Sequence, residues 1–176
     1  MEQHEDLAGA LGRVTGWQGR DAVIEPAIPV LASPSWRGVD GLPLVARDRA
    51  SGETLFIKQI HPDTAFYIDI PASFDAAVKA GEIGVGPRVL LADAAAGVLI
   101  MEDLSAEAGW RVAGLEKGYD PDFVAAVVAA RRAYAAVAPL LREVDVFAEI
   151  ESFYAMALAE KVTLPAETGW MVDMAR

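Results

Sequence analysis

Cysteine is absent from this 176-residue chain. A chain without thiols forms no disulfide, has no thiolate nucleophile and offers no cysteine ligand to a metal ion. Histidine is scarce as well, because only His4 and His61 occur. No histidines and carboxylates recur at metal-ligand spacing, so we predict no metal site. The absence of disulfides makes the cytoplasm the expected compartment.

Long apolar runs are also lacking. No stretch reaches about 18 uninterrupted apolar residues, so we predict no membrane span. The opening MEQHED is acidic and lacks the basic and apolar start of a signal peptide. Cations are outnumbered, with 15 Lys and Arg against 26 Asp and Glu and a net charge of −11. Because this charge opposes phosphate backbones and anionic lipids, neither nucleic acid nor a membrane is an expected partner.

Apolar residues are abundant and make up 53% of the chain, which is enough for a core. Among them is TLFIKQI at 54–60, a β-prone run with a single lysine. Side chains alternate along a strand, so Lys58 falls on the face opposite Leu55 and Ile57. One explanation is a solvated edge strand, where lysine discourages pairing with another sheet. The other explanation is a lysine that holds the phosphate oxygens of a nucleotide.

The segments before this run predict a mostly antiparallel sheet. Residues 22–31 are apolar but contain two prolines, which is typical of an edge strand. Residues 33–41 are rich in turn formers and predict a loop. A strand over 42–47 and a turn over 49–53 precede the lysine strand, so we expect these two strands to pair as an antiparallel hairpin.

One helix and two further strands follow. Residues 71–82 carry an apolar face at helical spacing, and Gly84 stands where a glycine commonly ends a helix. Residues 88–93 and 97–101 predict two short strands joined by a turn. The expected fold class is therefore α+β, a mostly antiparallel five-stranded sheet with one helix packed on it.

Beyond residue 104 the sequence changes character. Asp120 followed by proline is a strong helix start, and Pro139 should kink or end that helix. Two further helical segments are predicted over 147–158 and 167–174. The predicted organisation is a sheet domain, a linker and a helical segment: 1–104, 105–119 and 120–176.

Four stretches carry a resemblance to a known family: LFIK at 55–58, FDAA at 74–77, GVGPRVL at 84–90 and VLIMEDL at 98–104. Their order and spacing resemble the small, nucleotide-binding lobe of the choline kinase and aminoglycoside phosphotransferase family, which has a protein-kinase-like fold. The helical segment 120–176 resembles the start of the large lobe, which is incomplete in this chain.

The resemblance implies that the chain binds ATP. Lys58 would hold the α- and β-phosphates, and the helix carboxylate Asp75 would pair with it. The family usually has glutamate at that position, so a solvated helix charge is the alternative role of Asp75. The segment containing Met101, Glu102 and Leu104 would form the hinge against adenine. An ordinary core position is the alternative role of Met101.

Two departures from the family pattern matter. The loop over the phosphates is represented only by Gly38 and Gly41, for which a hairpin turn is the alternative role. The catalytic loop His-x-Asp-x-x-x-x-Asn has no counterpart, because the stretch that begins at His61 ends in Ile68. We therefore assign no catalytic residue and no metal ligand, and expect Mg²⁺ only with the missing part of the large lobe. This chain alone is predicted to be inactive.

Three hypotheses remain open at this point. The first is the ATP-binding portion of a small-molecule phosphotransferase acting on an alcohol such as choline or an aminoglycoside. The second is a non-catalytic interaction module on the same scaffold. The third is an unrelated α+β domain. In an incomplete fold the apolar faces of the last helices lack cover, so a homodimer or a second chain is expected to cover them.

Overall fold

The structure is a computed structural model that describes residues 2–27, 41–61, 64, 67–104, 109–111, 113–137 and 143–175. The chain divides into two compact units, Met1–Leu141 and Arg142–Arg176. This division falls after residue 141 and not at the predicted linker 105–119, because the helix that follows the linker is grouped with the sheet.

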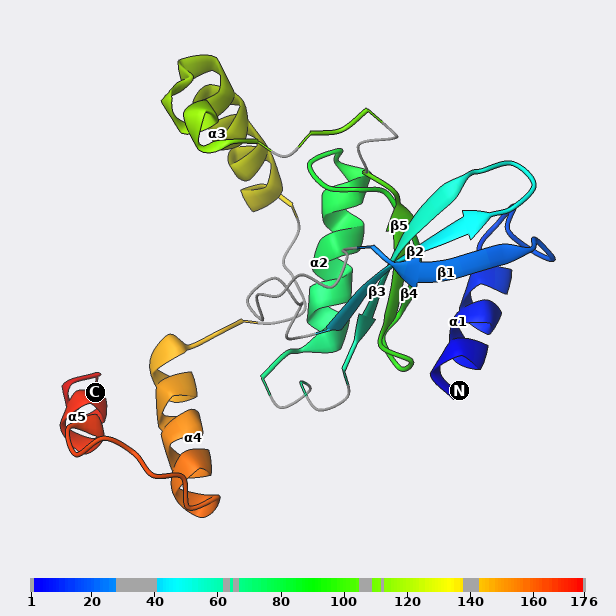
Figure 1. The fold of residues 1–176 in the computed structure, drawn as a ribbon. Coiled ribbons are helices and arrows are strands. Elements are labelled where there is room, and N and C mark those ends of the chain that lie inside the picture. The colour runs from blue at the N-terminus through cyan, green and yellow to red at the C-terminus, as the bar shows by residue number, and fades with distance from the viewer. Residues whose placement is uncertain are drawn as a thin grey trace. The chain divides into compact units, whose positions relative to one another are not determined.

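The first unit is built on a five-stranded antiparallel sheet with the strand order β1-β2-β3-β5-β4 (Figure 1). The helix α2 (Ile70–Glu82) lies between β3 and β4 in the chain. The predicted α+β class and five-stranded sheet are thus confirmed. The strands are β1 (Ala22–Pro26), β2 (Gly41–Asp48), β3 (Thr54–Ile60), β4 (Val89–Asp93) and β5 (Val98–Glu102).

The predicted hairpin is confirmed by the register of β2 and β3, which places Leu44 opposite Ile57 in an antiparallel pair. β1 lies at the edge of the sheet, as its prolines predict, since proline has no amide to donate to a neighbour. The strand expected over 22–31 ends at Pro26, and its second proline lies outside the described residues.

Two helices cover the two faces of the sheet. The first, α1 (Glu2–Gly12), and the loop after it bury Leu7 and Trp17 in one apolar cluster with strand residues. α2 covers the opposite face (Figure 1). Its Phe74 is buried there together with Leu99. Burying a large apolar side chain stabilises the fold by about 1.5–3 kcal/mol. Each face of the sheet therefore carries its own buried apolar cluster.

Both ends of α2 are capped, and of the two caps only the one at Gly84 was predicted. At its start, the carboxylate of Asp69 accepts a hydrogen bond from the amide of Ala72 at 3.0 Å. At its end, Gly84 has a left-handed conformation with φ of 72°, and its amide donates to the carbonyl of Gly81 at 3.1 Å. This conformation is the one that glycine adopts without a steric penalty, which explains the residue at this position.

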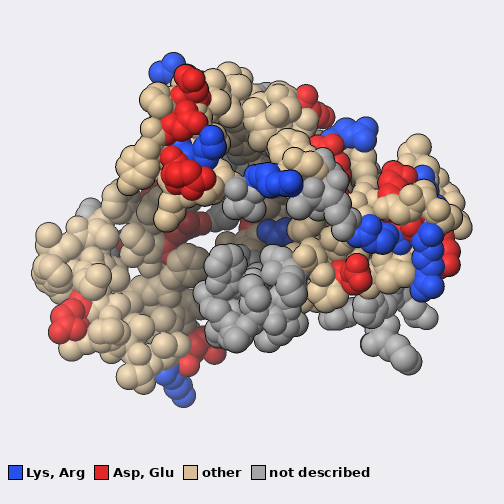
Figure 2. Space-filling model, turned by 45° about the horizontal axis from the view of Figure 1, so that its top comes forward, with Lys and Arg blue, Asp and Glu red and all other residues tan. Residues whose placement is uncertain are grey.

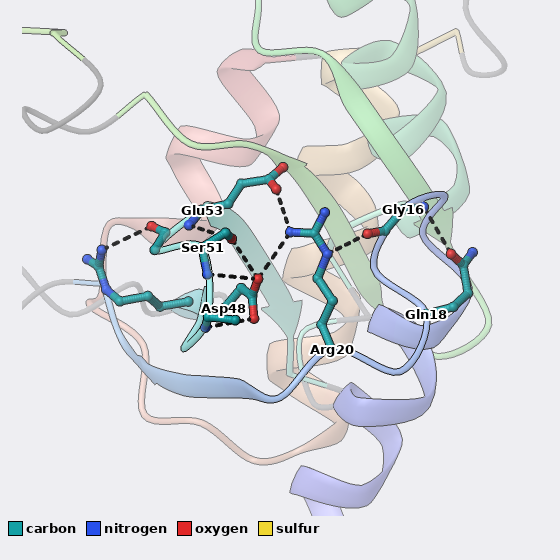
Figure 3. A network of polar contacts seen from close by, with 9 residues as sticks. Gly16, Gln18, Arg20, Asp48, Ser51 and Glu53 are labelled. Carbon is teal, nitrogen blue, oxygen red and sulfur yellow. Dashed lines mark hydrogen bonds and ion pairs between the residues drawn. The ribbon is translucent and has the colours of Figure 1, made fainter.

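A polar network ties the loop after α1 to the turn between β2 and β3 (Figure 3). Arg20 forms ion pairs with Asp48, at 3.4 Å, and with Glu53. The hydroxyl of Ser51 donates to Asp48 at 2.6 Å. This hydrogen bond, the amides of the turn and the nearby guanidinium hold the pKa of Asp48 below its ordinary value, although burial opposes them. The guanidinium also lies 4.9 Å from the ring centroid of Trp17.

A 3₁₀ helix (Leu115–Tyr119) leads into α3 (Pro121–Ala135). The carboxylate of Asp120 accepts hydrogen bonds from two amides of the first turn of α3, which confirms the predicted helix start. A hydrogen bond from Lys117 is the main reason that the pKa of Asp120 lies below its ordinary value. α3 ends ahead of Pro139, which lies outside the described residues.

The second unit contains α4 (Val146–Ala159) and α5 (Thr168–Ala175), close to the predicted helices over 147–158 and 167–174. After α4 the chain turns through Lys161, which has a left-handed φ of 55°. Throughout the described parts of the chain, no helix has the length and apolar character needed to cross a membrane.

Candidate functional site

Lys58 is exposed although it lies on a central strand. β3 pairs with β2 on one side and with β5 on the other, so the edge-strand explanation of this lysine is wrong. Leu55 and Ile57 are 4% and 0% exposed in the cluster beneath α1. Because side chains alternate, Lys58 lies on the opposite face, as predicted.

An apolar strip lies beside this lysine on the same face of the sheet. It consists of Val45, Phe56 and Met101, which are register partners across β2, β3 and β5 and are all partly buried. Phe56 precedes Lys58 by two residues, so both side chains project from the same face. The alternation of the strand already places Phe56 there, but only the register sets it beside Met101.

α2 packs on the same face as Lys58. Ile60 and Leu99 are buried against Phe74 of this helix, and Leu99 is the register partner of Lys58. Along β3, Lys58 therefore lies between Ile60, which α2 covers, and the partly buried Phe56. This position places an exposed ammonium group at the border between the helix-covered and the open part of the face.

Asp75, the carboxylate expected to pair with Lys58, is bound to a different lysine. Its Oδ2 lies 2.7 Å from Nζ of Lys79, one turn further along α2, and the two side chains are 24% and 22% exposed. The four-residue spacing of this pair is a signal that the sequence contains. The side chain of Lys58 has no ion pair or hydrogen bond to any described residue. The expected ion pair between Asp75 and Lys58 is therefore not formed.

The predicted hinge consists of the end of β5 and the residues just after it, and carboxylates hold it in place. The Oε1 atom of Glu102 accepts from the amide of Arg88 at 2.8 Å, and the amide of Glu102 donates to the carbonyl of Arg88 at 3.0 Å. The hydroxyl of Thr54 donates to Asp103 at 2.8 Å. Leu104 is 37% exposed, and its amide has no partner within the described ranges. The Glu102 side chain thus has a structural role.

The structure describes one of the two candidate loop glycines, Gly41. Gly38 lies outside the described residues. Gly41 is the first residue of β2 and is paired with Ile60. A Cβ atom at position 41 would lie 2.3 Å from the carbonyl oxygen of Gln59. The close approach of two strand backbones therefore requires glycine here, independently of any ligand.

Comparisons with protein-family models, with curated proteins and with solved structures all found nothing. In the part of the chain that the structure describes, no group of three or more histidine and carboxylate side chains is placed to hold a metal ion. The geometry instead offers an exposed ammonium group beside a partly buried apolar strip.

Proposed function

We propose that the first unit binds ATP through Lys58 and forms the nucleotide-binding portion of a small-molecule phosphotransferase with a protein-kinase-like fold. The observation that carries this proposal is the exposure of Lys58 on the central strand β3, where none of the described carboxylates neutralises it. A cation at such a position is available to a ligand phosphate, to which lysine binds as a point charge.

The apolar strip supports a ligand that has an apolar end as well as an anionic end. A nucleotide has both, because its phosphates can meet Lys58 while its flat base packs against Phe56 and Met101. Leu104, which is 37% exposed, lies two residues beyond the end of the strand that carries Met101. Backbone donors and acceptors at such a place can hydrogen-bond the edge of a base.

The order of elements supports the same proposal. The family resemblance implies three strands, one helix and two strands, with the lysine in the third strand. From β1 to β5 the first unit has this order, with Lys58 in β3 and α2 after it. Phosphoryl transfer to an alcohol also needs an acceptor-orienting aspartate and carboxylate or amide ligands for Mg²⁺. We assign none of these to this chain, so the proposal for it is limited to nucleotide binding.

Thermal unfolding with and without Mg-ATP tests the proposal. A ligand at 100 times its Kd stabilises the folded state by about 2.7 kcal/mol. A hydrogen bond to a charged group contributes about 1.5–3 kcal/mol. Lys58→Ala should therefore weaken Mg-ATP binding by about 10- to 100-fold. The matched control is Lys161→Ala, which removes the same charge from the second unit and should bind Mg-ATP as tightly as the unaltered chain.

Two outcomes would contradict the nucleotide site. One is an equal stabilisation of Lys58→Ala and the unaltered chain by Mg-ATP. The other is no stabilisation of the unaltered chain at millimolar Mg-ATP, beyond that given by Mg²⁺ alone. The second outcome favours the alternative function, a non-catalytic interaction module. The Asp75–Lys79 pair favours that alternative, since it leaves Lys58 without the carboxylate that a catalytic site uses to position it.

A further inference from the structure

The second unit has an apolar hollow of about 460 Å³ that α4, α5 and the chain between them line. We call it the α4–α5 groove. Its lining is almost wholly apolar and includes Phe153, Leu164 and Met171. The volume lies within the range of about 300–1,000 Å³ that is typical of binding pockets. The groove is therefore large enough to accept several apolar side chains of a partner.

Large apolar side chains also lie exposed around the groove. Phe147, Trp170 and Met174 are 61%, 66% and 70% exposed. Three of the five methionines of the chain, Met156 among them, lie on α4 and α5. Methionine is flexible and is frequent on surfaces that adapt to a binding partner. An exposed apolar surface of this extent indicates an interaction site.

The surroundings of the groove are acidic. Residues 142–176 contain seven carboxylates and only three cations. A second hollow of about 390 Å³ adjoins the groove through Ala175, which lines both. It is also lined by Glu151 and by Asp145, whose carboxylate caps the start of α4. In Figure 2 the left part of the molecule, over α4 and α5, is mainly neutral with charged groups at its margin. An apolar groove in an acidic unit thus defines the surface.

We propose that the α4–α5 groove binds a basic amphipathic helix of a protein partner. Such a helix inserts apolar side chains three and four residues apart into a groove, while its lysines and arginines meet surrounding carboxylates. A second copy of this chain fits less well, because it brings the same acidic unit and a net charge of −11. An anionic membrane surface is opposed by the same charge.

Fluorescence anisotropy of the full chain with labelled peptides about five helical turns long tests this proposal. The first peptide has a leucine face and a lysine face, and the second has glutamate in place of each lysine. The third has the composition of the first in an order without an apolar face. The first peptide should bind at least about tenfold more tightly than the other two. If the third peptide bound as tightly as the first, charge alone would account for binding. If the second bound as tightly as the first, charge would have no role. Either result would overturn the proposal.

A matched pair of substitutions locates the binding surface. Met171 lines the groove and is 61% exposed, whereas Met174 lies on the same helix, is 70% exposed and does not line it. Met171→Lys should weaken binding of the first peptide by at least about tenfold, and Met174→Lys by less than about threefold. Equal losses in the two variants would overturn the assignment, as would no binding of the first peptide by the unaltered chain.

Hydrogen exchange of the unaltered chain provides a second test, which does not require any variant to fold. The first peptide should protect amides of α4 and α5, and protection confined to the sheet would overturn the proposal. Two further outcomes would also overturn the proposal. One is a dimer of the free chain that Met171→Lys dissociates, because a second copy then covers the groove. The other is binding to phosphatidylglycerol vesicles that Met171→Lys abolishes.

Discussion

Gly41→Ala would place a Cβ atom where the backbone of the neighbouring strand already lies. The added atom would be 2.3 Å from the carbonyl oxygen of Gln59 and 3.1 Å from Cα of Ile60, whereas ordinary contact begins at 3.4 Å. The start of β2 and the end of β3 would therefore have to separate by about 1 Å. Because both clashing atoms belong to the backbone, no side-chain rotation relieves the contact.

The expected cost follows from this geometry. Forcing extra volume into a packed region destabilises a protein by about 1–3 kcal/mol. The free energy of unfolding of a domain is about 5–15 kcal/mol, so this is a substantial fraction of it. For a chain of this size each kcal/mol lowers the Tm by about 2–4 °C. The Tm of Gly41→Ala should thus fall by roughly 2 to 12 °C in the absence of any ligand.

The matched control is Gly118→Ala, because an added Cβ at Gly118 meets no atom within 4 Å. Urea titration followed by circular dichroism measures the free energy of unfolding of both variants. Hydrogen exchange then shows whether the loss is confined to β2 and β3, as the clash requires. If the two variants agree within about 0.5 kcal/mol, the close approach of the strands is refuted. The glycine would then be explained only by the phosphate loop that the family resemblance implies.

Two further predictions concern the turn after α4 and the polar network of the first unit. Lys161 has a left-handed φ of 55°, and its amide donates to the carbonyl of Leu158 in a helix-ending arrangement that usually contains glycine. Lys161→Gly should therefore stabilise the second unit by about 1 kcal/mol in thermal melts, whereas Lys161→Ala should not, and equal effects would contradict the reasoning. The pKa of Asp48 is lowered in the folded state, chiefly by the hydrogen bond from Ser51. As the pH falls below about 4, the unfolded state binds more protons at this residue than the folded state does, so stability decreases. Asp48→Asn should make this decrease shallower in urea titrations at fixed pH, and a slope equal to that of the unaltered chain would show that Asp48 is not its source.

Local features of the sequence predicted most of the helices and strands, and Gly84 and Asp120 marked two of the helix ends. The caps at Asp69, Gly84 and Asp120 depend on groups within four residues of each other, so they can be recognised without knowledge of the fold. The face on which Lys58 lies follows from the alternation of one strand. The pairing of Asp75 with Lys79 is local too, and the four-residue spacing could have predicted it.

Tertiary structure decided what lies around these elements. The sequence alone left open whether the strand of Lys58 is an edge strand, because strand order depends on partners far apart in the chain. The pairing of β3 with both β2 and β5 settles that question and brings Phe56 beside Met101. The same sheet pairing brings the backbone of Gln59 so close to position 41 that only glycine fits there. Each of these outcomes rests on contacts between distant segments, and such contacts form only when the whole sheet does.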